Sequence, residues 1–428
     1  MELFGTSGIR GVYPNFVSAE LFTKIGLSLG TQAEGTVCVG RDFRTSSKQL
    51  QSALVSGILS TGAEVLDAGT CPTPVLAYAT KKFKASAGAV ITASHNPPEF
   101  NGVKLWQPDG SAYSPKMEKE IEALIKSGKS ERAGWGEVKN LSSVEALERY
   151  MEDITASFSI EGGLKTVADC GNGSVTLTAP EILSRVSDNI SIFDKPDGMF
   201  PNRLSEPSEK NLSELKKKVL SSKADLGFAF DGDGDRVAVI DNQGDFVKQD
   251  TLLAILAKSE LGKNSTIAVP VDTSMAIDEI GAKVIRTKVS DVYVSEALKQ
   301  ENGVFGGEAS GCYIFPEVHL CPDGLLAALK ILETMELSGK SMSELVAEIP
   351  SYPILRGVVE GDREKSFKKL SEKAKKLGGE LSETDGIRIQ LEEAWILVRK
   401  SGTEEKVRIT VEAHSEAMAR QLMGSIMN

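Results

Sequence analysis

Cysteine and histidine are scarce in this sequence. Its 428 residues include five cysteines, an odd number, and three histidines. The cysteines are widely separated, and no two of them form a Cys-x-x-Cys pair (Cys38, Cys71, Cys170, Cys312 and Cys321). The pattern argues against a zinc knuckle, a disulfide framework and a histidine-rich metal centre.

An excess of positive charge and a long apolar run are also missing. The formal net charge is -11, which argues against a surface built to bind nucleic acid. Phosphorylated small molecules remain possible, because they need only local positive charge. No run of about 18 apolar residues is present, so no membrane-spanning helix is expected. The first motif begins at Phe4 and leaves no room for a signal peptide, which predicts a cytoplasmic protein.

The stretch Thr92-Ala93-Ser94-His95-Asn96-Pro97 gives the first indication of chemistry. It could be a plain turn, because Asn-Pro commonly marks loops. It also suits a serine held on a rigid, exposed turn whose oxygen reacts. A strand predicted at Gly88–Thr92 would place Ser94 at the carboxyl end of a sheet, where ligands bind in open α/β folds.

Three carboxylates alternate with glycines in Asp231-Gly232-Asp233-Gly234-Asp235-Arg236. Alternating carboxylates on a tight loop converge on one hard cation, typically magnesium or calcium. A calcium-binding helix-loop-helix requires Glu at the twelfth position of such a loop, and that position is Asn242 here. The predicted ion is therefore Mg²⁺. A serine that carries phosphate, together with a magnesium site, predicts a phosphoryl-transfer enzyme.

The order of predicted elements indicates a repeated α/β fold. At 428 residues the chain is too long for one core, and its length suggests roughly three domains. A strand-then-helix rhythm begins at Thr36–Gly40, restarts at Lys165–Asp169 with a helix from about Leu177, and restarts at Ser265–Val269 with a helix through Met275–Ile280. Alternating strands and helices imply mainly parallel sheets.

The C-terminal part follows a different, α+β pattern. A lysine-rich helix is predicted at Ser366–Leu377, and a second helix at Ser415–Met427 closes the chain. Three strands are predicted between them, at Gly386–Leu391, Ala394–Arg399 and Val407–Ala413.

Together these motifs resemble the α-D-phosphohexomutase family, which includes phosphoglucomutase, phosphomannomutase and phosphoglucosamine mutase. The resemblance covers essentially the whole chain, from Phe4-Gly5-Thr6-Ser7-Gly8-Ile9-Arg10-Gly11 to Arg399-Lys400-Ser401-Gly402-Thr403-Glu404. It implies three similar α/β domains with mainly parallel, mixed sheets and a smaller α+β C-terminal domain around a central cleft. The expected domains are 1–150 with the serine loop, 151–250 with the magnesium loop, 251–355 with a sugar-binding loop and 356–428 with a phosphate-binding loop.

The resemblance also implies roles in catalysis. Ser94 is expected to carry phosphate and to share Mg²⁺ with three further ligands, Asp231, Asp233 and Asp235. Lys288 is the first candidate for proton exchange with the sugar hydroxyl, with Lys104 and His95 as competitors. A lysine in that role needs a pKa lowered by burial or by neighbouring cations. Arg10 is expected to reach the serine loop.

A second set of residues is expected to hold the substrate. Gly306–Gly311 has the composition of a ligand-gripping loop, and the resemblance implies that Glu308 and Ser310 bind adjacent sugar hydroxyls. Near the C-terminus, a glycine turn with hydroxyls and arginines can hold a dianionic phosphate. Its members are Arg399, Ser401, Gly402, Thr403 and Arg408. Arg236 and Ser290 are expected to contact phosphate and sugar.

Three positions depart from the family pattern. Cys312 stands where relatives commonly carry His, Ser290 replaces a usual glycine, and Glu405 replaces a usual proline. Because these positions adjoin the expected substrate contacts, they leave the choice of sugar open.

The expected activity is the interconversion of a hexose 1-phosphate and a hexose 6-phosphate. It would proceed through phospho-Ser94 and a bisphosphorylated hexose, in a monomer or a homodimer. Alternatives are a phosphopentomutase of the same family, a sugar-phosphate phosphatase, and a non-catalytic regulator that binds sugar phosphates.

Overall fold

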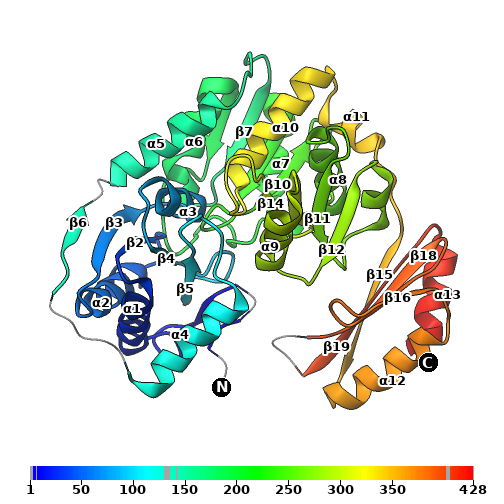
Figure 1. Ribbon diagram of the computed structural model, residues 1–428. Helices are drawn as coiled ribbons and strands as arrows, with labels where there is room; N and C mark the ends of the chain where they lie inside the picture. The colour runs from blue at the N-terminus through cyan, green and yellow to red at the C-terminus, as the bar shows by residue number, and fades with distance from the viewer. Residues whose placement is uncertain (1–2, 6, 130–134, 141–142, 402–404, 428) are drawn as a thin grey trace. The chain divides into compact units, whose positions relative to one another are not determined.

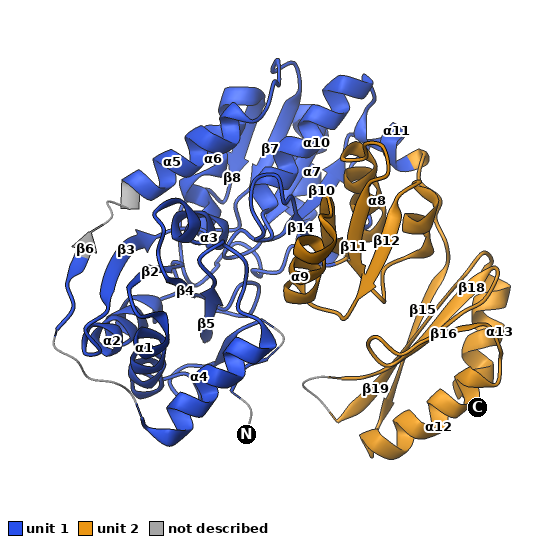
Figure 2. Cartoon of the chain, viewed as in Figure 1, with its two compact units in different colours: residues 1–248, 310–346 blue, residues 249–309, 347–428 orange. Residues whose placement is uncertain are grey.

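The computed structural model describes residues 3–5, 7–129, 135–140, 143–401 and 405–427. The chain divides into two units, which Figure 2 shows in different colours. Unit 1 comprises residues 1–248 and 310–346, and unit 2 comprises residues 249–309 and 347–428.

The first sheet of unit 1 has six strands in the order β1-β5-β4-β2-β3-β6 (Figure 1). Parallel pairing joins β4 (Ala87–Ile91), β2 (Thr36–Arg41), β3 (Glu64–Thr70) and β6 (Val138–Asn140). Antiparallel pairing adds β5 (Phe100–Trp106) to β4 and β1 (Ile9–Val12) to β5. Every residue of β4 is buried, as is typical of a central strand covered on both faces.

Helices in two groups pack around this sheet. One group consists of α1 (Ala19–Ala33), α2 (Ser47–Leu59) and α4 (Pro115–Ser127), and the other of α3 (Thr73–Lys82) and α5 (Ser143–Ala156). α1 begins where the Ser18 side chain accepts a hydrogen bond from Leu21 N, a typical N-cap. Its buried residues Phe22, Ile25 and Leu29 are spaced by three and four positions, so they share the face that meets the core.

The second sheet of unit 1 has the order β10-β9-β7-β8. β8 (Asp188–Ile192), β7 (Lys165–Asp169) and β9 (Leu226–Phe230) are parallel, whereas β10 (Val237–Asp241) is antiparallel to β9. α6 (Ala179–Val186) and α7 (Ser213–Ser222) pack on β7.

Residues 310–346 complete unit 1 with β14 (Cys312–Ile314), α10 (Gly324–Ser338) and most of α11 (Met342–Ala347). α10 packs on β10, and Gly324 N donates a hydrogen bond of 3.1 Å to Gly234 O. This segment is therefore anchored to the loop that joins β9 to β10.

Unit 2 begins with parallel pairing of β11 (Thr266–Pro270) with β12 (Lys283–Thr287) and with β13 (Phe305–Glu308). α8 (Gln249–Ser259) and α9 (Asp291–Glu301) pack beside these strands. The C-terminal sheet is antiparallel, in the order β15-β19-β18-β17-β16. Its strands are β15 (Ile354–Glu360), β16 (Glu380–Ser382), β17 (Ile387–Gln390), β18 (Ala394–Lys400) and β19 (Lys406–Ala413).

One face of the C-terminal sheet is apolar. Val407, Ile409 and Val411 of β19 point into a core shared with α12 (Arg363–Lys375) and α13 (Glu416–Met427). Because side chains alternate along a strand, Arg408, Thr410 and Glu412 lie on the opposite face, which we call the open face.

The predicted fold class is confirmed: three α/β assemblies with mainly parallel strands, two of them in mixed sheets, precede a smaller antiparallel α+β domain. Two predicted helices differ in detail. Residues Met275–Glu279 form a short 3-10 helix, because β12 begins at Lys283 and leaves room for little more than one turn. The helix expected from about Leu177 is a 3-10 turn at Ser174–Leu177 followed by α6.

The expected domain limits stay predictions. Residue 150 falls inside α5, and residue 355 falls inside β15. Each described helix is too short or too polar to span a lipid bilayer.

A buried carboxylate joins the C-terminal sheet to the loop after β11. Glu412 is fully buried and accepts hydrogen bonds from Ser274 Oγ (2.5 Å), Met275 N (2.7 Å) and Trp395 Nε1 (2.5 Å). Trp395 also packs against Val271 and Met275. Because a buried carboxylate is tolerated only where its oxygens find donors, this contact fixes two parts of unit 2 to each other.

Replacing Glu412 by Ala should lower the free energy of unfolding by about 2–4 kcal/mol, since three buried donors would lose their acceptor. Urea denaturation measures the change. Glu416→Ala, on the exposed start of α13, serves as the control and should change stability by less than about 0.5 kcal/mol. Equal losses in both variants would contradict this account.

Candidate active site

Ser94 follows β4 with its backbone in the left-handed region, at a φ of 51°. Residues other than glycine rarely adopt this conformation, so neighbouring groups must hold it. Ser94 N donates to Thr92 Oγ1 (2.9 Å), and Asn96 N donates to Ala93 O (3.0 Å), which closes a tight turn. The Ser94 hydroxyl donates to Asp231 Oδ2 at 2.7 Å. The serine and aspartate motifs, 137 residues apart, are therefore in direct contact.

The expectation of an exposed serine is wrong, because Ser94 is fully buried within unit 1. Both of its oxygen atoms are engaged by other segments. The hydroxyl contacts Asp231, and the carbonyl accepts hydrogen bonds from Arg44 Nη2 (2.7 Å) and Ser205 Oγ (3.0 Å).

Arg44 fills the inside of the serine loop. Its buried guanidinium donates to four carbonyl oxygens, those of Ser94 (2.7 Å), Asn96 (2.6 Å), Pro97 (2.6 Å) and Phe100 (2.9 Å). Its Nε donates to Asp42 Oδ2 at 3.1 Å, and Asp42 also accepts from Thr92 Oγ1 at 2.7 Å. Arg44 was not predicted from the sequence, although it follows closely after β2, the strand beside β4, where polar side chains of a site are expected.

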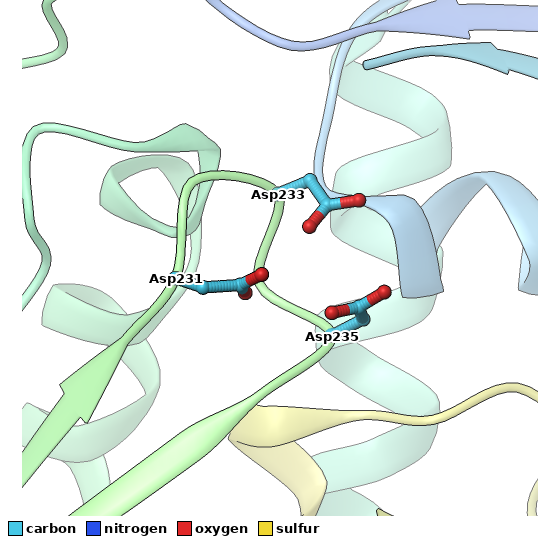
Figure 3. A group of neighbouring side chains, drawn as sticks. All are labelled: Asp231, Asp233 and Asp235. Atoms are coloured by element: carbon cyan, nitrogen blue, oxygen red, sulfur yellow. The ribbon is translucent and has the colours of Figure 1, made fainter. Parts of the chain in front are cut away.

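The three aspartates of the second motif point toward one another in Figure 3. Each offers a carboxylate oxygen within 4.8 Å of the others, and all three side chains are buried. Gly234, with a φ of 78°, allows the chain to reverse between β9 and β10. At Gly232 a Cβ atom would lie 2.7 Å from Ser94 O, so only glycine lets the two loops approach this closely.

Lys104 of β5 partly neutralises these carboxylates. Its Nζ lies 2.9 Å from Asp233 Oδ2 and also contacts Asp235 Oδ2. Burial lowers the pKa of Lys104, but Asp233 and Asp235 outweigh that effect and raise it above its ordinary value. Because proton exchange near neutral pH requires a lowered lysine pKa, this arrangement favours a counter-ion role for Lys104.

The carboxylates themselves have different environments. Burial raises the pKa of Asp231, and the charges of Asp235 and Asp233 raise it further. Burial would also raise the pKa of Asp233, but Lys104 and a 2.6 Å hydrogen bond from Thr73 Oγ1 hold it below its usual value.

The aspartate group fits a magnesium ion. Asp233 Oδ1 and Asp235 Oδ1 are buried, and neither has a hydrogen-bond partner among the described residues. A polar atom left buried in this way loses free energy unless a ligand or water reaches it. The donors are all carboxylate oxygens, the type that Mg²⁺ prefers to thiolates and imidazoles.

His95 lies between Ser94 and Glu206, an acidic residue outside the aspartate loop. Its Nδ1 is 3.3 Å from Ser94 Oγ, and its Nε2 is 3.6 Å from Glu206 Oε2. Burial and the cations Arg236 and Arg10 lower the pKa of His95 to about 2, so the ring is neutral at pH 7 in this arrangement. Glu206 was not predicted from the sequence, because no local pattern distinguishes a single Glu in a proline-containing loop.

Two predicted arginines border the same region of unit 1. Arg10 contacts the serine loop, because its Nη1 donates to Asn96 Oδ1 at 3.4 Å. Arg236 Nη1 lies 3.4 Å from Glu206 Oε1, and its buried Nε has no hydrogen-bond partner among the described residues. Cys312 is buried and forms an isolated backbone bridge with Arg236, so this departure from the family pattern lies beside the aspartate loop.

Other predicted residues lie in unit 2. Lys288 follows β12, with its Nζ 5.4 Å from the centroid of the Tyr293 ring. Ser290 accepts a hydrogen bond from Val292 N (3.3 Å) and caps α9, which gives this departure from glycine a structural role. Glu308 is the last residue of β13, whereas its predicted companion Ser310 belongs to unit 1.

The predicted phosphate-binding motif begins at the end of β18. Arg399 Nη1 donates to Asp385 Oδ2 at 2.9 Å, and Arg408 of β19 lies directly opposite Arg399. Ser401 is buried, and its carbonyl accepts from Arg363 Nη1 at 3.1 Å. The predicted residues Gly402 and Thr403 lie outside the described part of the chain.

Four family models match successive parts of the chain. The phosphoglucomutase/phosphomannomutase alpha/beta/alpha domains I, II and III match residues 1–132, 148–244 and 248–352, and the C-terminal domain of the same family matches residues 358–428.

Relatives match over the full length. A probable phosphoglucosamine mutase from Thermococcus gammatolerans is 42% identical, and the match covers 98% of this chain and 96% of the relative. One from Methanococcoides burtonii is 41% identical, with 100% of both chains covered. The solved phosphoglucomutase/phosphomannomutase family protein of Burkholderia thailandensis has a TM-score of 0.91 at 27% identity, covering 99% of this chain and 96% of that one.

Three α/β domains, an antiparallel fourth domain and a serine loop bonded to a triple-aspartate loop define the class of phosphosugar mutases. The chain belongs to the phosphoglucomutase/phosphomannomutase family within the phosphohexomutases, as its motifs predicted.

Replacing Arg44 by Met should lower the free energy of unfolding by about 3–5 kcal/mol, because Asp42 would become a buried, unpaired charge. The double variant Arg44→Met with Asp42→Asn removes that charge and should recover part of the loss. Urea denaturation of both variants measures the difference. If the double variant is no more stable than the single one, the Asp42–Arg44 pair does not act as described.

Proposed function

We propose that this protein interconverts a hexose 1-phosphate and a hexose 6-phosphate, with glucosamine phosphate as the favoured substrate. The observation that carries the proposal is the hydrogen bond from Ser94 Oγ to Asp231, which joins a reactive hydroxyl to a group suited to Mg²⁺. The names of the full-length relatives support the amino sugar.

In the proposed cycle, phospho-Ser94 donates its phosphoryl group to the free hydroxyl of the substrate. The resulting bisphosphorylated sugar turns over and returns its other phosphate to Ser94. Asp231, Asp233 and Asp235 would hold Mg²⁺, which neutralises the charge on the transferring phosphoryl group when it is bound.

The residues around Ser94 and the aspartates are proposed to have supporting roles. Arg10 and Asn96 keep the serine loop in place, and Lys104 balances the carboxylates. Lys288 is the proposed group for proton exchange with the sugar hydroxyl, and His95, whose Nδ1 lies 3.3 Å from Ser94 Oγ, is its competitor.

The remaining predicted residues are proposed to recognise the substrate. Glu308 and Ser310 are proposed to bind sugar hydroxyls, and Ser290 and Arg236 to contact sugar and phosphate. The phosphate that is not being transferred would be held by the C-terminal motif of Arg399, Ser401, Gly402, Thr403 and Arg408. The protein would act in the cytoplasm as a monomer or a homodimer.

Freshly purified protein should contain a subpopulation that is heavier by one phosphate, and Ser94→Ala should abolish it. Intact-mass spectrometry measures this. A coupled assay with a panel of hexose 1-phosphates, with and without a trace of hexose bisphosphate, then tests the reaction. Isomerised product supports the mutase, whereas free phosphate identifies a phosphatase. Full activity in Ser94→Ala would refute the central role of this serine.

Asp233→Asn should weaken Mg²⁺ binding and slow turnover by at least about 100-fold, because the carboxylates position the ion that stabilises the transferring phosphoryl group. Calorimetric titration with Mg²⁺ provides a readout that does not depend on activity. Asp245→Asn, an exposed change on the turn after β10, is the matched control and should alter neither quantity. Turnover that persists in chelator at the wild-type rate would exclude the metal role.

A further inference from the structure

Cationic residues gather on the open face of the C-terminal sheet. In Figure 1, β15, β19 and β18 run side by side in this domain. Their register places Arg399 opposite Arg408 and Arg356 opposite Thr410. Because alternate residues share a face, Arg356, Arg399 and Arg408 all project from the side opposite α12 and α13.

A cavity of about 340 Å³ lies over these residues. Arg356, Arg399, Arg408 and Lys406 line it, and Asp272, in the loop after β11, is the one carboxylate among its lining residues. Four cations thus face one anion in a space large enough for a phosphate group. The remaining lining residues are uncharged, so the imbalance is a property of the cavity as a whole.

The arrangement is electrostatically unfavourable without a ligand. Like charges directly opposite each other on neighbouring strands destabilise a sheet, and Arg399 and Arg408 form such a pair. Arg356 is two positions from the residue opposite Arg408, a diagonal separation of roughly 7–8 Å at which long side chains can meet. Asp385 Oδ2 lies 2.9 Å from Arg399 Nη1 and compensates its charge, and Asp272 lines the same cavity as the arginines. A dianion in the cavity would relieve the remaining repulsion.

Arg388, a fourth arginine on the open face, is held by packing contacts and a backbone hydrogen bond. The Arg388 guanidinium lies 5.0 Å from the centroid of the Trp395 ring, and its Nε donates to Val271 O at 3.1 Å. Arg388 is buried by these contacts, whereas Arg356 and Arg408 are exposed. Packing therefore accounts for Arg388, whereas Arg356 is exposed along the cavity.

We propose that Arg356 is a third arginine of the phosphate site and contacts the phosphate of the substrate that is not being transferred. The proposal rests on the proposed function and adds a residue that the motif around Ser401 does not contain. A phosphate is the favoured occupant because several guanidinium groups can each donate paired hydrogen bonds to its oxygens. A monoanionic carboxylate would leave most of the positive charge uncompensated.

The test compares Arg356→Gln, Arg356→Lys and Arg420→Gln in the full-length protein. Arg420 lies on the exposed surface of α13 and pairs with Glu416, so it controls for loss of one positive charge. Calorimetry with glucosamine 6-phosphate, in a Ser94→Ala background that prevents turnover, measures affinity directly. Steady-state kinetics on the Ser94 enzymes then separates KM from kcat.

Arg356→Gln should weaken binding of glucosamine 6-phosphate by about tenfold, as expected for one charge-assisted hydrogen bond at a partly exposed site. KM should rise by a similar factor with kcat nearly unchanged. Arg356→Lys should recover part of the affinity, and Arg420→Gln should match the unmodified protein. A residue that only supports the sheet would not give this division between KM and kcat.

Affinity in Arg356→Gln within about twofold of the unmodified protein, or an equal loss in Arg420→Gln, would overturn the proposal. The outcome is separable from that of the proposed function. If the wild-type protein isomerises no hexose phosphate, the function fails, while calorimetry with inorganic phosphate still decides whether Arg356 belongs to an anion site.

Discussion

The concentration of negative charge on the loop between β9 and β10 constrains the rest of unit 1. Three carboxylates are buried within reach of one another, a situation that is unfavourable unless cations and hydrogen-bond donors compensate it. The fold brings Lys104 from another sheet to two of them and supplies backbone donors to Asp231 from Gly234 and Arg236. Asp233 Oδ1 and Asp235 Oδ1 still have no hydrogen-bond partner within the described chain, which points to a metal ion.

The same constraint explains why the serine loop needs so much support. Ser94 must approach a negatively charged loop with its backbone in an unfavourable conformation, and neither condition is stable by itself. Arg44 donates hydrogen bonds to four carbonyls of the loop, and Ser205, in the loop after β8, donates to the Ser94 carbonyl. Arg44 thus also brings a buried positive charge close to the serine. Loop geometry and local electrostatics are controlled by the same side chain.

Features set by local sequence could be predicted, whereas features set by contacts between distant segments could not. Ser94 and the aspartates were identifiable because each motif is contiguous and its residue types have few other uses together. The alternation of strands and helices could also be predicted, because each element follows from a local sequence pattern. Arg44, Ser205 and Glu206 were missed because their roles depend on contacts between segments that are far apart in the chain. Burial of Ser94 and the raised pKa of Lys104 also arise only when two sheets meet.

Ser290 and Cys312, two departures from the family pattern, have different environments in the structure. Ser290 caps a helix, so a local requirement of α9 is enough to account for it. Cys312 is bridged to Arg236 beside the aspartate loop, where a thiol offers weaker hydrogen bonding than imidazole and no positive charge near neutral pH. Arg236 Nε lies 3.9 Å from Asp235 Oδ1, so a change at Cys312 would reach the aspartate loop through Arg236. The position of Cys312 therefore connects this departure to the aspartate loop.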